Sequence, residues 1–307
     1  MYTEFYGLKE LPFALTPDPR FIYFTPSHTE VMANLHYGIE SCKGFIVVTG
    51  EVGTGKTTIL RWMMQRLDRT VLVAYIFNPR LSVTEFYQHL ASLLDVQKWE
   101  TKPELLELLS QTLNSRHSRG LRTVLIIDEA QGLSPSVLEE IRLLSNFESD
   151  TAKKLQIVLT GQPELRTILN NPDLRQLKQR ISLRCVVNPL PNVHETDRYI
   201  TSRLLASGAE RTDIFSSDAI DYVYRCTEGI PRNINNLCDN ALLAGYAAGE
   251  VIIGRPIIEE VAENLDMLPW VDRGIYADQE IQLPASIFSM PCRAELWAPG
   301  DGTVDSN

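Results

Sequence analysis

The chain of 307 residues has no apolar run long enough to cross a membrane. A spanning helix needs about 18 or more consecutive apolar residues, and no such stretch occurs. The first ten residues, MYTEFYGLKE, also lack the basic start and the apolar centre of a secretory leader. We therefore expect a cytoplasmic protein without a transmembrane segment, which would lie at the inner membrane only through a partner.

Cysteine pairs and positive charge are also scarce. The cysteines are scattered and form no C-x-x-C pair, which argues against a zinc site and a disulfide framework. They are Cys42, Cys185, Cys226, Cys238 and Cys292. The net charge of -10 argues against a protein that coats nucleic acid with its whole surface, although it leaves room for a local basic patch. The length predicts about two domains.

What the sequence does contain is a phosphate-binding motif, GEVGTGKTT, at residues 50–58. It fits G-x-x-x-x-G-K-[ST] and stands between an apolar run and a helix-like stretch, where backbone N–H groups and a helix N-terminus favour phosphate. The predicted nucleotide ligands are Gly50, Glu51, Val52, Gly53, Thr54, Gly55, Lys56, Thr57 and Thr58. Lys56 is expected to reach the β- and γ-phosphates, and Thr57 to complete the Mg²⁺ shell.

A second chemical signal is the pair Asp128 and Glu129, directly after the apolar run at residues 123–127. Phosphoryl transfer requires one carboxylate for Mg²⁺ and a second that orients or deprotonates the attacking water. We assign Asp128 to the metal and Glu129 to the water. After the next apolar run, at residues 155–160, either Gln162 or Thr160 is expected to lie beside the γ-phosphate.

Apolar runs alternate with helical spacing along the first 190 residues. The runs at residues 45–48, 70–77, 123–127, 155–160 and 181–187 are predicted strands, and 70–77 is expected to be covered on both faces. Helices are predicted at residues 27–41, 59–67, 83–94, 103–114, 135–147 and 174–181. This order predicts an α/β fold, with a parallel sheet and helices on both faces.

Beyond residue 190 the β-branched runs stop and four helices are predicted, at residues 195–207, 217–226, 232–248 and 256–265. We therefore divide the chain into a nucleotide-binding part (1–190), a helical lid (191–268) and an irregular tail (269–307). Arg232 follows Pro231 at a helix start and is predicted to add positive charge to the phosphates from across the cleft.

Two further segments have more than one interpretation. Residues 1–30, which we call the lead-in, are rich in proline and aromatic rings and are expected to wrap the core. Their rings either close over the adenine base or serve only for packing. Ser27 is expected to cap the helix that follows. The basic stretch with Arg175, Lys178, Arg180 and Arg184 forms either a solvated face or a trans-acting arginine finger. Arg180 is our first choice for the finger.

These features together resemble the AAA+ ATPases, and over residues 1 to about 266 they are similar to the ExeA/GspA-type secretion ATPases. The similar segments are Tyr6-Gly7-Leu8, Pro12-Phe13, Pro17-Asp18-Pro19, Tyr37-Gly38-Ile39, Gly44-Phe45, residues 50–58, Asp128-Glu129-Ala130-Gln131 and GQPEL at residues 161–165. The resemblance implies a Mg²⁺-dependent ATPase that forms oligomers and positions or remodels a protein partner. It makes Lys56 and Thr57 Walker A, Asp128 and Glu129 Walker B, Gln162 or Thr160 sensor 1, and Arg232 sensor 2.

Secretion members of that family carry a membrane span and a peptidoglycan-binding domain after the ATPase part. The present sequence has only the tail from Pro269, so we expect no direct action on the cell wall. Our leading hypothesis is an ATPase of secretion, or of cell-envelope or exopolysaccharide assembly. The alternatives are a DNA-associated AAA+ regulator of the transposition (TniB/TnsC-like) type and a nucleotide switch with little turnover. The DNA hypothesis relies on Arg116, Arg119 and Arg122 and on the basic stretch, whereas Glu129 argues against a pure switch.

Overall fold

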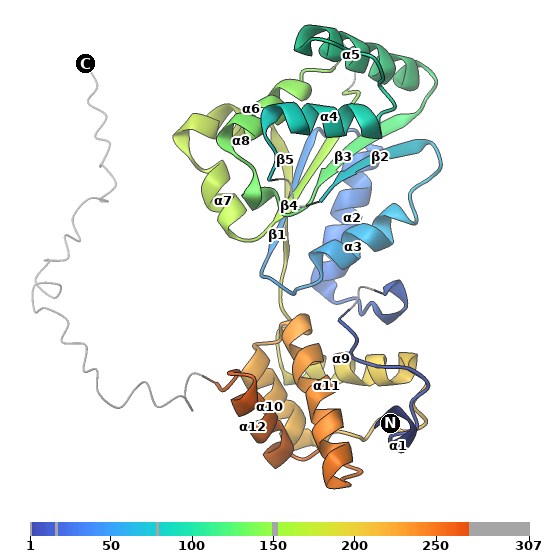
Figure 1. Ribbon diagram of the computed structural model, residues 1–307, viewed down its shortest axis with the longest axis vertical. Coiled ribbons are helices and arrows are strands. Elements are labelled where there is room, and N and C mark those ends of the chain that lie inside the picture. The colour runs from blue at the N-terminus through green and yellow to red at the C-terminus, as the bar shows by residue number, and fades with distance from the viewer. Residues whose placement is uncertain (1, 16–17, 78–79, 149–152, 270–307) are drawn as a thin grey trace, which may run out of the picture. The chain divides into compact units, whose positions relative to one another are not determined.

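The computed structural model describes residues 2–15, 18–77, 80–148 and 153–269 (Figure 1). Residues 1–268 form one compact unit. The predicted tail lies outside the described residues apart from Pro269, and so do Pro17 of the lead-in and Cys292. No helix in the described ranges is both long and apolar enough to cross a membrane.

Five strands form one parallel sheet in the order β2-β3-β4-β1-β5 (Figure 1). They are β1 (Phe45–Gly50), β2 (Val71–Ile76), β3 (Arg122–Ile127), β4 (Gln156–Gly161) and β5 (Ile181–Val187). Thr49 pairs with Gly161, and Ile127 with Leu159. The residues that follow β1, β3 and β4 therefore meet at one edge of the sheet, where ligands bind in open α/β sheets.

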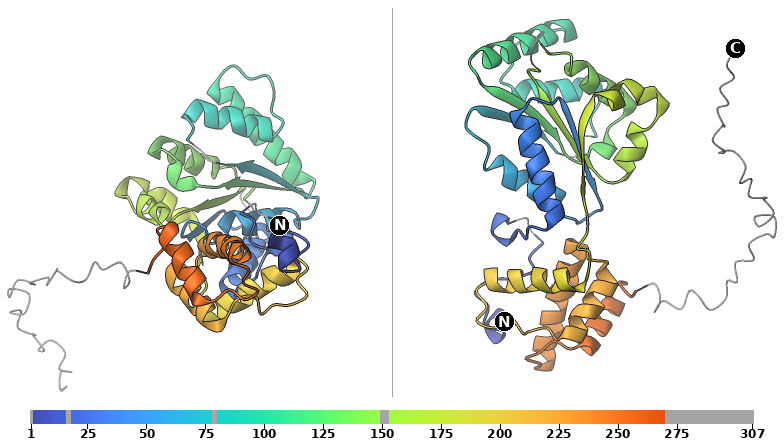
Figure 2. Two further views of the ribbon diagram at one scale, coloured as in Figure 1. Left: turned by 60° about the horizontal axis from the view of Figure 1, so that its bottom comes forward. Right: turned by 180° about the vertical axis from the view of Figure 1, so that it is seen from behind.

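Helices cover both faces of this sheet. The helices are α2 (Pro26–Glu40), α3 (Lys56–Met64), α4 (Val83–Leu93), α5 (Lys102–Ser118), α6 (Pro135–Leu144), α7 (Glu164–Leu169) and α8 (Arg175–Arg180). Alternate strand residues enter different clusters: Phe45 and Leu125 pack with α4–α8, whereas Ile46 and Val124 pack with α2 and α3. Figure 2 shows α2 lying along one face of the sheet. The predicted α/β fold is confirmed.

Strand β2 differs from its prediction. It lies at the edge of the sheet and bonds only to β3 among the described strands. Val71, Val73 and Tyr75 pack against the cluster of α2 and α3 but are only half-buried, so the expected cover of both faces is incomplete. β-branched residues favour strands both at the centre and at the edge of a sheet, so this run predicts a strand but not how deeply it is buried.

The start of α2 also differs from its prediction. The capping residue is Thr25, whose hydroxyl accepts a hydrogen bond from the His28 N–H at 3.1 Å. Ser27 instead donates to the Val186 carbonyl and accepts from the Asn188 N–H. The cap therefore lies two residues earlier than predicted, and Pro26 opens the first turn, where the missing N–H of proline costs nothing.

The helical part consists of α9 (Val193–Ala206), α10 (Ser217–Thr227), α11 (Pro231–Ala248) and α12 (Arg255–Asn264). These four helices share one apolar cluster, which includes Ile200, Val223, Leu237 and Ala262. The structure thus contains the four predicted helices, within a few residues of their predicted ends. A domain boundary at residue 190 stays a prediction.

The first part of the lead-in packs into the same cluster. Tyr2 in α1 (Tyr2–Phe5), Tyr6, Leu8 and Phe13 are buried among the helices of the helical part. The Tyr6 hydroxyl donates to the Glu250 carbonyl at 2.9 Å, and the Tyr2 hydroxyl donates to Asp239. Residues 2–13 therefore cover the helical part, because their rings complete a core that four short helices leave open.

Candidate nucleotide site

The phosphate-binding motif has the expected strand–loop–helix geometry. β1 ends at Gly50, the loop follows, and α3 begins at Lys56 with Gly55 as its N-cap. Gly53 and Gly55 have φ of 84° and 98°, a left-handed conformation that side chains other than glycine rarely adopt. The sequence G-x-G before the lysine is therefore required by the bend that turns the loop N–H groups toward the helix start.

Lys56 is buried beneath this loop. Its Nζ donates to the carbonyls of Gly50 at 2.8 Å and Glu51 at 2.9 Å. Burial lowers the pKa of the Lys56 ammonium below its usual range, although Glu129 and Asp128 oppose the shift. Two backbone carbonyl oxygens hold the ammonium group in place. Phosphate oxygens carry more negative charge than carbonyl oxygens, so those of a bound nucleotide can replace them as acceptors.

Asp128 lies fully buried at the end of β3, and its two carboxylate oxygens accept four hydrogen bonds. Oδ2 accepts from the Thr57 hydroxyl at 2.7 Å and from the Tyr75 hydroxyl at 3.1 Å. Oδ1 accepts from the Thr160 hydroxyl and from the Glu129 N–H. Burial, reinforced by Asp128, raises the pKa of Tyr75 well above its usual range, so this phenol stays a donor.

This arrangement fits a Mg²⁺ ion. The Thr57 hydroxyl and the Asp128 carboxylate are hard oxygen ligands that lie in direct contact. The described residues contain no group of three or more His, Cys, Asp or Glu side chains that could hold a metal ion alone. Mg²⁺ usually binds through one or two protein oxygens together with phosphates and water. Thr57 and Asp128 provide these protein oxygens, and the other positions around the ion are left for phosphate and water.

Glu129 follows Asp128 in a left-handed backbone conformation, with φ 56° and ψ 38°. Its Oε2 accepts hydrogen bonds from the side-chain amides of Gln131 and Gln162, the latter at 3.3 Å. The two candidates for the polar residue after β4 therefore contact different carboxylates: Thr160 reaches Asp128, and Gln162 reaches Glu129.

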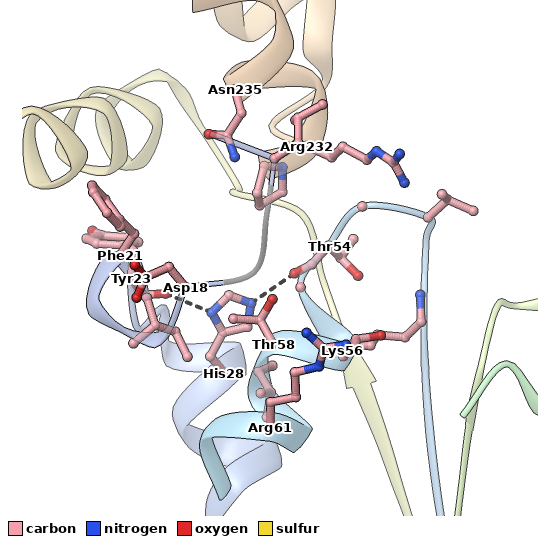
Figure 3. A pocket seen from close by; sticks show the side chains of 18 of the residues that line it. Asp18, Phe21, Tyr23, His28, Thr54, Lys56, Thr58, Arg61, Arg232 and Asn235 are labelled. Atoms are coloured by element: carbon pink, nitrogen blue, oxygen red, sulfur yellow. Dashed lines mark hydrogen bonds between the residues drawn. The ribbon is translucent and has the colours of Figure 1, made fainter. Parts of the chain in front are cut away.

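A cavity of about 390 Å³ opens beside the loop (Figure 3). We call one wall the loop side; it consists of Gly53, Thr54, Gly55, Lys56, Thr57, Thr58, Arg61 and Glu129. We call the opposite wall the lead-in side; it consists of Phe21, Ile22, Tyr23, Tyr199, Arg203 and Asn235. The apolar rings of the lead-in side and the polar loop side suit a ligand with a flat base and a phosphate chain.

Arg232 lies where the two walls meet. Its backbone N–H donates to the Gly53 carbonyl at 3.2 Å, and its exposed side chain lines the cavity (Figure 3). A Cβ at Gly53 would lie 2.6 Å from the Arg232 Cβ. The start of α11 thus packs directly on the phosphate-binding loop, and its predicted contribution of charge toward the phosphates remains a prediction.

His28, which the sequence reasoning missed, joins the two walls. Its Nδ1 lies 2.9 Å from the Tyr23 carbonyl oxygen, and its Nε2 lies 3.2 Å from the Thr54 carbonyl oxygen (Figure 3). Because both neighbours are acceptors, the ring donates to one when neutral and to both when protonated. Its position in the first turn of α2, directly after the aromatic residues of the lead-in, was the only signal in the sequence.

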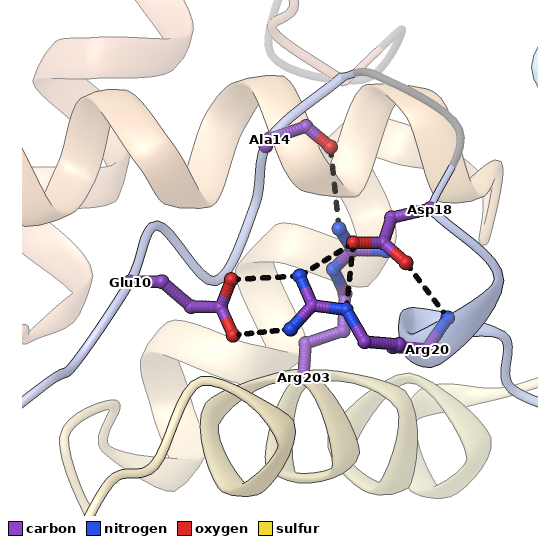
Figure 4. A network of polar contacts seen from close by, with 5 residues as sticks. All are labelled: Glu10, Ala14, Asp18, Arg20 and Arg203. Atoms are coloured by element: carbon purple, nitrogen blue, oxygen red, sulfur yellow. Dashed lines mark hydrogen bonds and ion pairs between the residues drawn. The ribbon is translucent and has the colours of Figure 1, made fainter.

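Arg203 fixes the lead-in to α9. The side chain is 7% exposed, and it donates to the carbonyls of Pro12 at 2.6 Å and Ala14 at 3.2 Å. Beside it, Arg20 forms exposed ion pairs with Glu10 and Asp18 (Figure 4). The buried Arg203 guanidinium also donates to the Tyr199 hydroxyl, which in turn donates to Asn235 on α11. One polar network therefore connects the lead-in, α9 and α11.

The predicted arginine finger lies elsewhere. Arg180, at the end of α8, is not among the described residues that line the cavity, and its guanidinium donates to the Ser145 hydroxyl. Two arginines proposed for DNA binding also have partners within the chain. Arg116 donates to the Thr123 hydroxyl and to the Arg122 carbonyl, and Arg122 forms an ion pair with Glu40.

Comparisons with known proteins found similar chains. A family model described as an AAA domain matches residues 39–169. General secretion pathway protein A from Aeromonas hydrophila is 42% identical over 254 residues, which make up 81% of this chain and 46% of that protein. The chain thus spans about half the length of this relative.

Two solved structures show a related fold at low sequence identity. Cdc6p from Pyrobaculum aerophilum has a TM-score of 0.64 and 17% identity, and covers 84% of this chain and 70% of its own. Drosophila ORC bound to DNA has a TM-score of 0.61 and 18% identity, and covers 83% of this chain and 66% of its own. At such identities the likeness concerns the fold alone.

Proposed function

We propose a function for this chain from the premise that it belongs to the AAA ATPases of the ExeA/GspA type. The proposed activity is Mg²⁺-dependent hydrolysis of ATP to ADP and phosphate in a homo-oligomer. The proposed role is in secretion, or in cell-envelope or exopolysaccharide assembly, through a protein partner. The relative is named for the general secretion pathway. Because the present chain spans only part of that protein, a role of this chain in the same pathway is a proposal.

One observation carries the proposal: Lys56, Asp128 and Glu129 converge at the ends of β1 and β3, beside a cavity with an aromatic wall. These are the three charges that cleavage of a terminal phosphate requires, since its barrier falls mainly through positioning and charge stabilisation. A chain that only bound nucleotide would have no use for the Glu129 carboxylate beside the buried lysine.

In this mechanism Lys56 turns from the loop carbonyls to the β- and γ-phosphate oxygens. Glu129 accepts a proton from the attacking water, and Thr57 and Asp128 would hold the Mg²⁺ ion. Bound Mg²⁺ would supply positive charge to the phosphate oxygens. Arg232 offsets charge within the same chain, and Arg180 does so from a neighbouring copy once its contact with Ser145 is given up.

The test is ATP turnover measured against protein concentration, with and without duplex DNA, in a Mg²⁺ buffer and in a matched buffer with EDTA. We expect turnover that EDTA abolishes and a specific activity that rises with concentration, because a neighbour completes the site. A rate independent of concentration would remove Arg180 from the mechanism. Absence of turnover at all concentrations would refute the proposed ATPase.

The DNA arm of this test addresses the second hypothesis. Arg116 and Arg122 already contact groups of their own chain, which reduces the charge they offer to a phosphate backbone. We therefore keep a protein partner as the proposal and expect DNA to leave the rate unchanged. A marked stimulation at low salt that disappears at high salt would favour the transposition-type regulator instead.

A further inference from the structure

Gln131 is a residue to which the sequence reasoning gave no role. It lies in the 3-10 turn η2 (Ala130–Gly132), two residues after Glu129. Its side-chain Nε2 donates to Glu129 Oε2 at 2.5 Å, and its Oε1 accepts from the Gln162 backbone N–H at 3.1 Å. Both ends of the amide are therefore used, one on the carboxylate and one on the residue after β4.

The end of β4 is shaped to admit this amide. A Cβ placed on Gly161 would lie 2.5 Å from the Gln131 Oε1, a distance that real Cβ contacts essentially never show. Gly161 has ordinary backbone angles, since it is absent from the positive-φ glycines of the described chain. Its lack of a side chain is thus explained by the space that Gln131 occupies and by the neighbouring Leu165, and not by backbone conformation.

The two amides hold one specific oxygen of Glu129. Gln131 and Gln162 both donate to Oε2, and no residue in the described part of the chain donates to Oε1. A carboxylate with one oxygen fixed by two donors has lost most of its freedom to rotate, while its other oxygen can still accept a proton. Fixing the base in this way is the kind of positioning on which the rate of a proton transfer depends.

We propose that Gln131 is a positioning residue for hydrolysis: it holds the Glu129 carboxylate through Oε2, so that Oε1 is left to accept the proton of the attacking water. Gly161 is the residue that gives it room. This inference rests on the proposed ATPase function and adds to it a residue that acts through Glu129, without touching the nucleotide.

The test compares the parent protein with Gln131→Met, which keeps the length of the side chain and removes both hydrogen bonds. We expect kcat to fall by about 10- to 100-fold, as for a misplaced catalytic group. The dissociation constant for a fluorescent ATP analogue should stay within about twofold, because Gln131 is not among the described residues that line the cavity. Gln111→Met is the matched control, since Gln111 is exposed on α5 and its side-chain amide donates a hydrogen bond to Glu107 on the same helix.

A double-mutant cycle separates positioning from a structural role. In a Glu129→Gln background, measured by single turnover with labelled ATP, adding Gln131→Met should cause no further loss of rate, because the group it positions is gone. Gly161→Ala, whose methyl group would displace the Gln131 amide, should reproduce the loss of kcat in the parent, and it serves as the second variant if Gln131→Met does not fold.

The outcomes are distinct. A parent that turns over ATP, with Gln131→Met within twofold of it in kcat, would overturn this inference and leave the proposed function standing. A further drop in the Glu129→Gln background would assign Gln131 a structural role and overturn it as well. A parent without turnover would reject the proposed function and, with it, this inference.

Discussion

The two walls of the cavity are built in different ways. On the loop side, the functional groups come from short motifs at strand ends, and Lys56 and Thr57 are neighbours in sequence. On the lead-in side, Arg203 holds the carbonyls of Pro12 and Ala14, which lie about 190 residues earlier in the chain. The loop side is thus a local structure on a rigid sheet, whereas the lead-in side exists only through packing between distant segments.

Substitutions on the two walls are therefore expected to have different effects. A change on the loop side should alter turnover or phosphate contacts and leave the fold intact, because the sheet holds the strand ends in place. A change on the lead-in side should alter stability and nucleotide affinity together, since the same contacts that build the wall also hold the helical part. Variants on each side test this difference.

The largest effect is expected from Glu129→Gln on the loop side. Removing the general base should lower kcat by about 10²- to 10⁴-fold. The melting temperature and the affinity for an ATP analogue should stay near the parent values, so that the variant accumulates bound ATP.

Lys56→Ala should do the opposite and weaken nucleotide binding first, by roughly 10-fold or more, because a charge-assisted contact is lost.

Turnover and equilibrium binding of a fluorescent analogue, measured on the same preparations, distinguish these two variants. Equal turnover of Glu129→Gln and the parent would remove Glu129 from its assigned role. Unchanged binding by Lys56→Ala would mean that the lysine remains on the loop carbonyls of Gly50 and Glu51 when nucleotide is bound.

A smaller effect on a different quantity is expected from Arg203→Met on the lead-in side. The carbonyls of Pro12 and Ala14 lose their donor, which should cost about 1 to 3 kcal/mol of unfolding free energy. Nucleotide affinity should fall as well, because Phe21 packs against the guanidinium. Chemical denaturation and analogue binding measure the two effects.

Arg20→Ala is the control in the same segment, because Arg20 is exposed and its ion pairs with Glu10 and Asp18 lie at the surface, where such pairs contribute little to stability. If Arg203→Met lost turnover but kept stability and affinity, the distinction between the two walls would fail. The guanidinium would then have to act in the reaction itself.

The smallest effect concerns pH. Burial, with Glu250 nearby, raises the pKa of Tyr6 to about 12. An acid with a raised pKa in the folded state stabilises the fold below its unfolded pKa of about 10, and this stabilisation is lost as the pH rises through 12. Tyr6→Phe should therefore flatten the decline in stability between about pH 10 and 12, as measured by urea denaturation. An unchanged decline would show that the Tyr6 phenol does not anchor the lead-in.

The sequence predicted the parts whose chemistry demands a local pattern. The glycine spacing around Lys56 and the acidic pair after β3 were visible because one strand end can present only a few consecutive residues. The parallel sheet and its helices followed from alternating apolar runs, and the structure confirms them. The edge position of β2 was missed, since a β-branched run looks alike at the centre and at the edge of a sheet.

The remaining parts of the site depend on tertiary contacts. His28 and Arg203 carry no motif, and their partners are backbone carbonyls, which every residue has. Gln131 belongs to the segment DEAQ at residues 128–131, yet its proposed role depends on Gly161 and Gln162 at the end of another strand. Only the pairing of β1, β3 and β4 in the sheet brings these residues within reach of one another.

The long separation between Arg203 and the lead-in has a consequence for how the protein is made. During synthesis the first fifteen residues leave the ribosome long before α9 and α11, and contacts between such distant segments form late because closing a long loop costs chain entropy. Strands β1–β5 are complete once residue 187 has emerged, so the sheet can fold first. Tyr2 and Tyr6 gain their partners only after Asp239 and Glu250 are made. The nascent chain therefore carries a formed phosphate loop for some time before it can enclose a nucleotide, and nucleotide affinity is acquired only after α11 has been made.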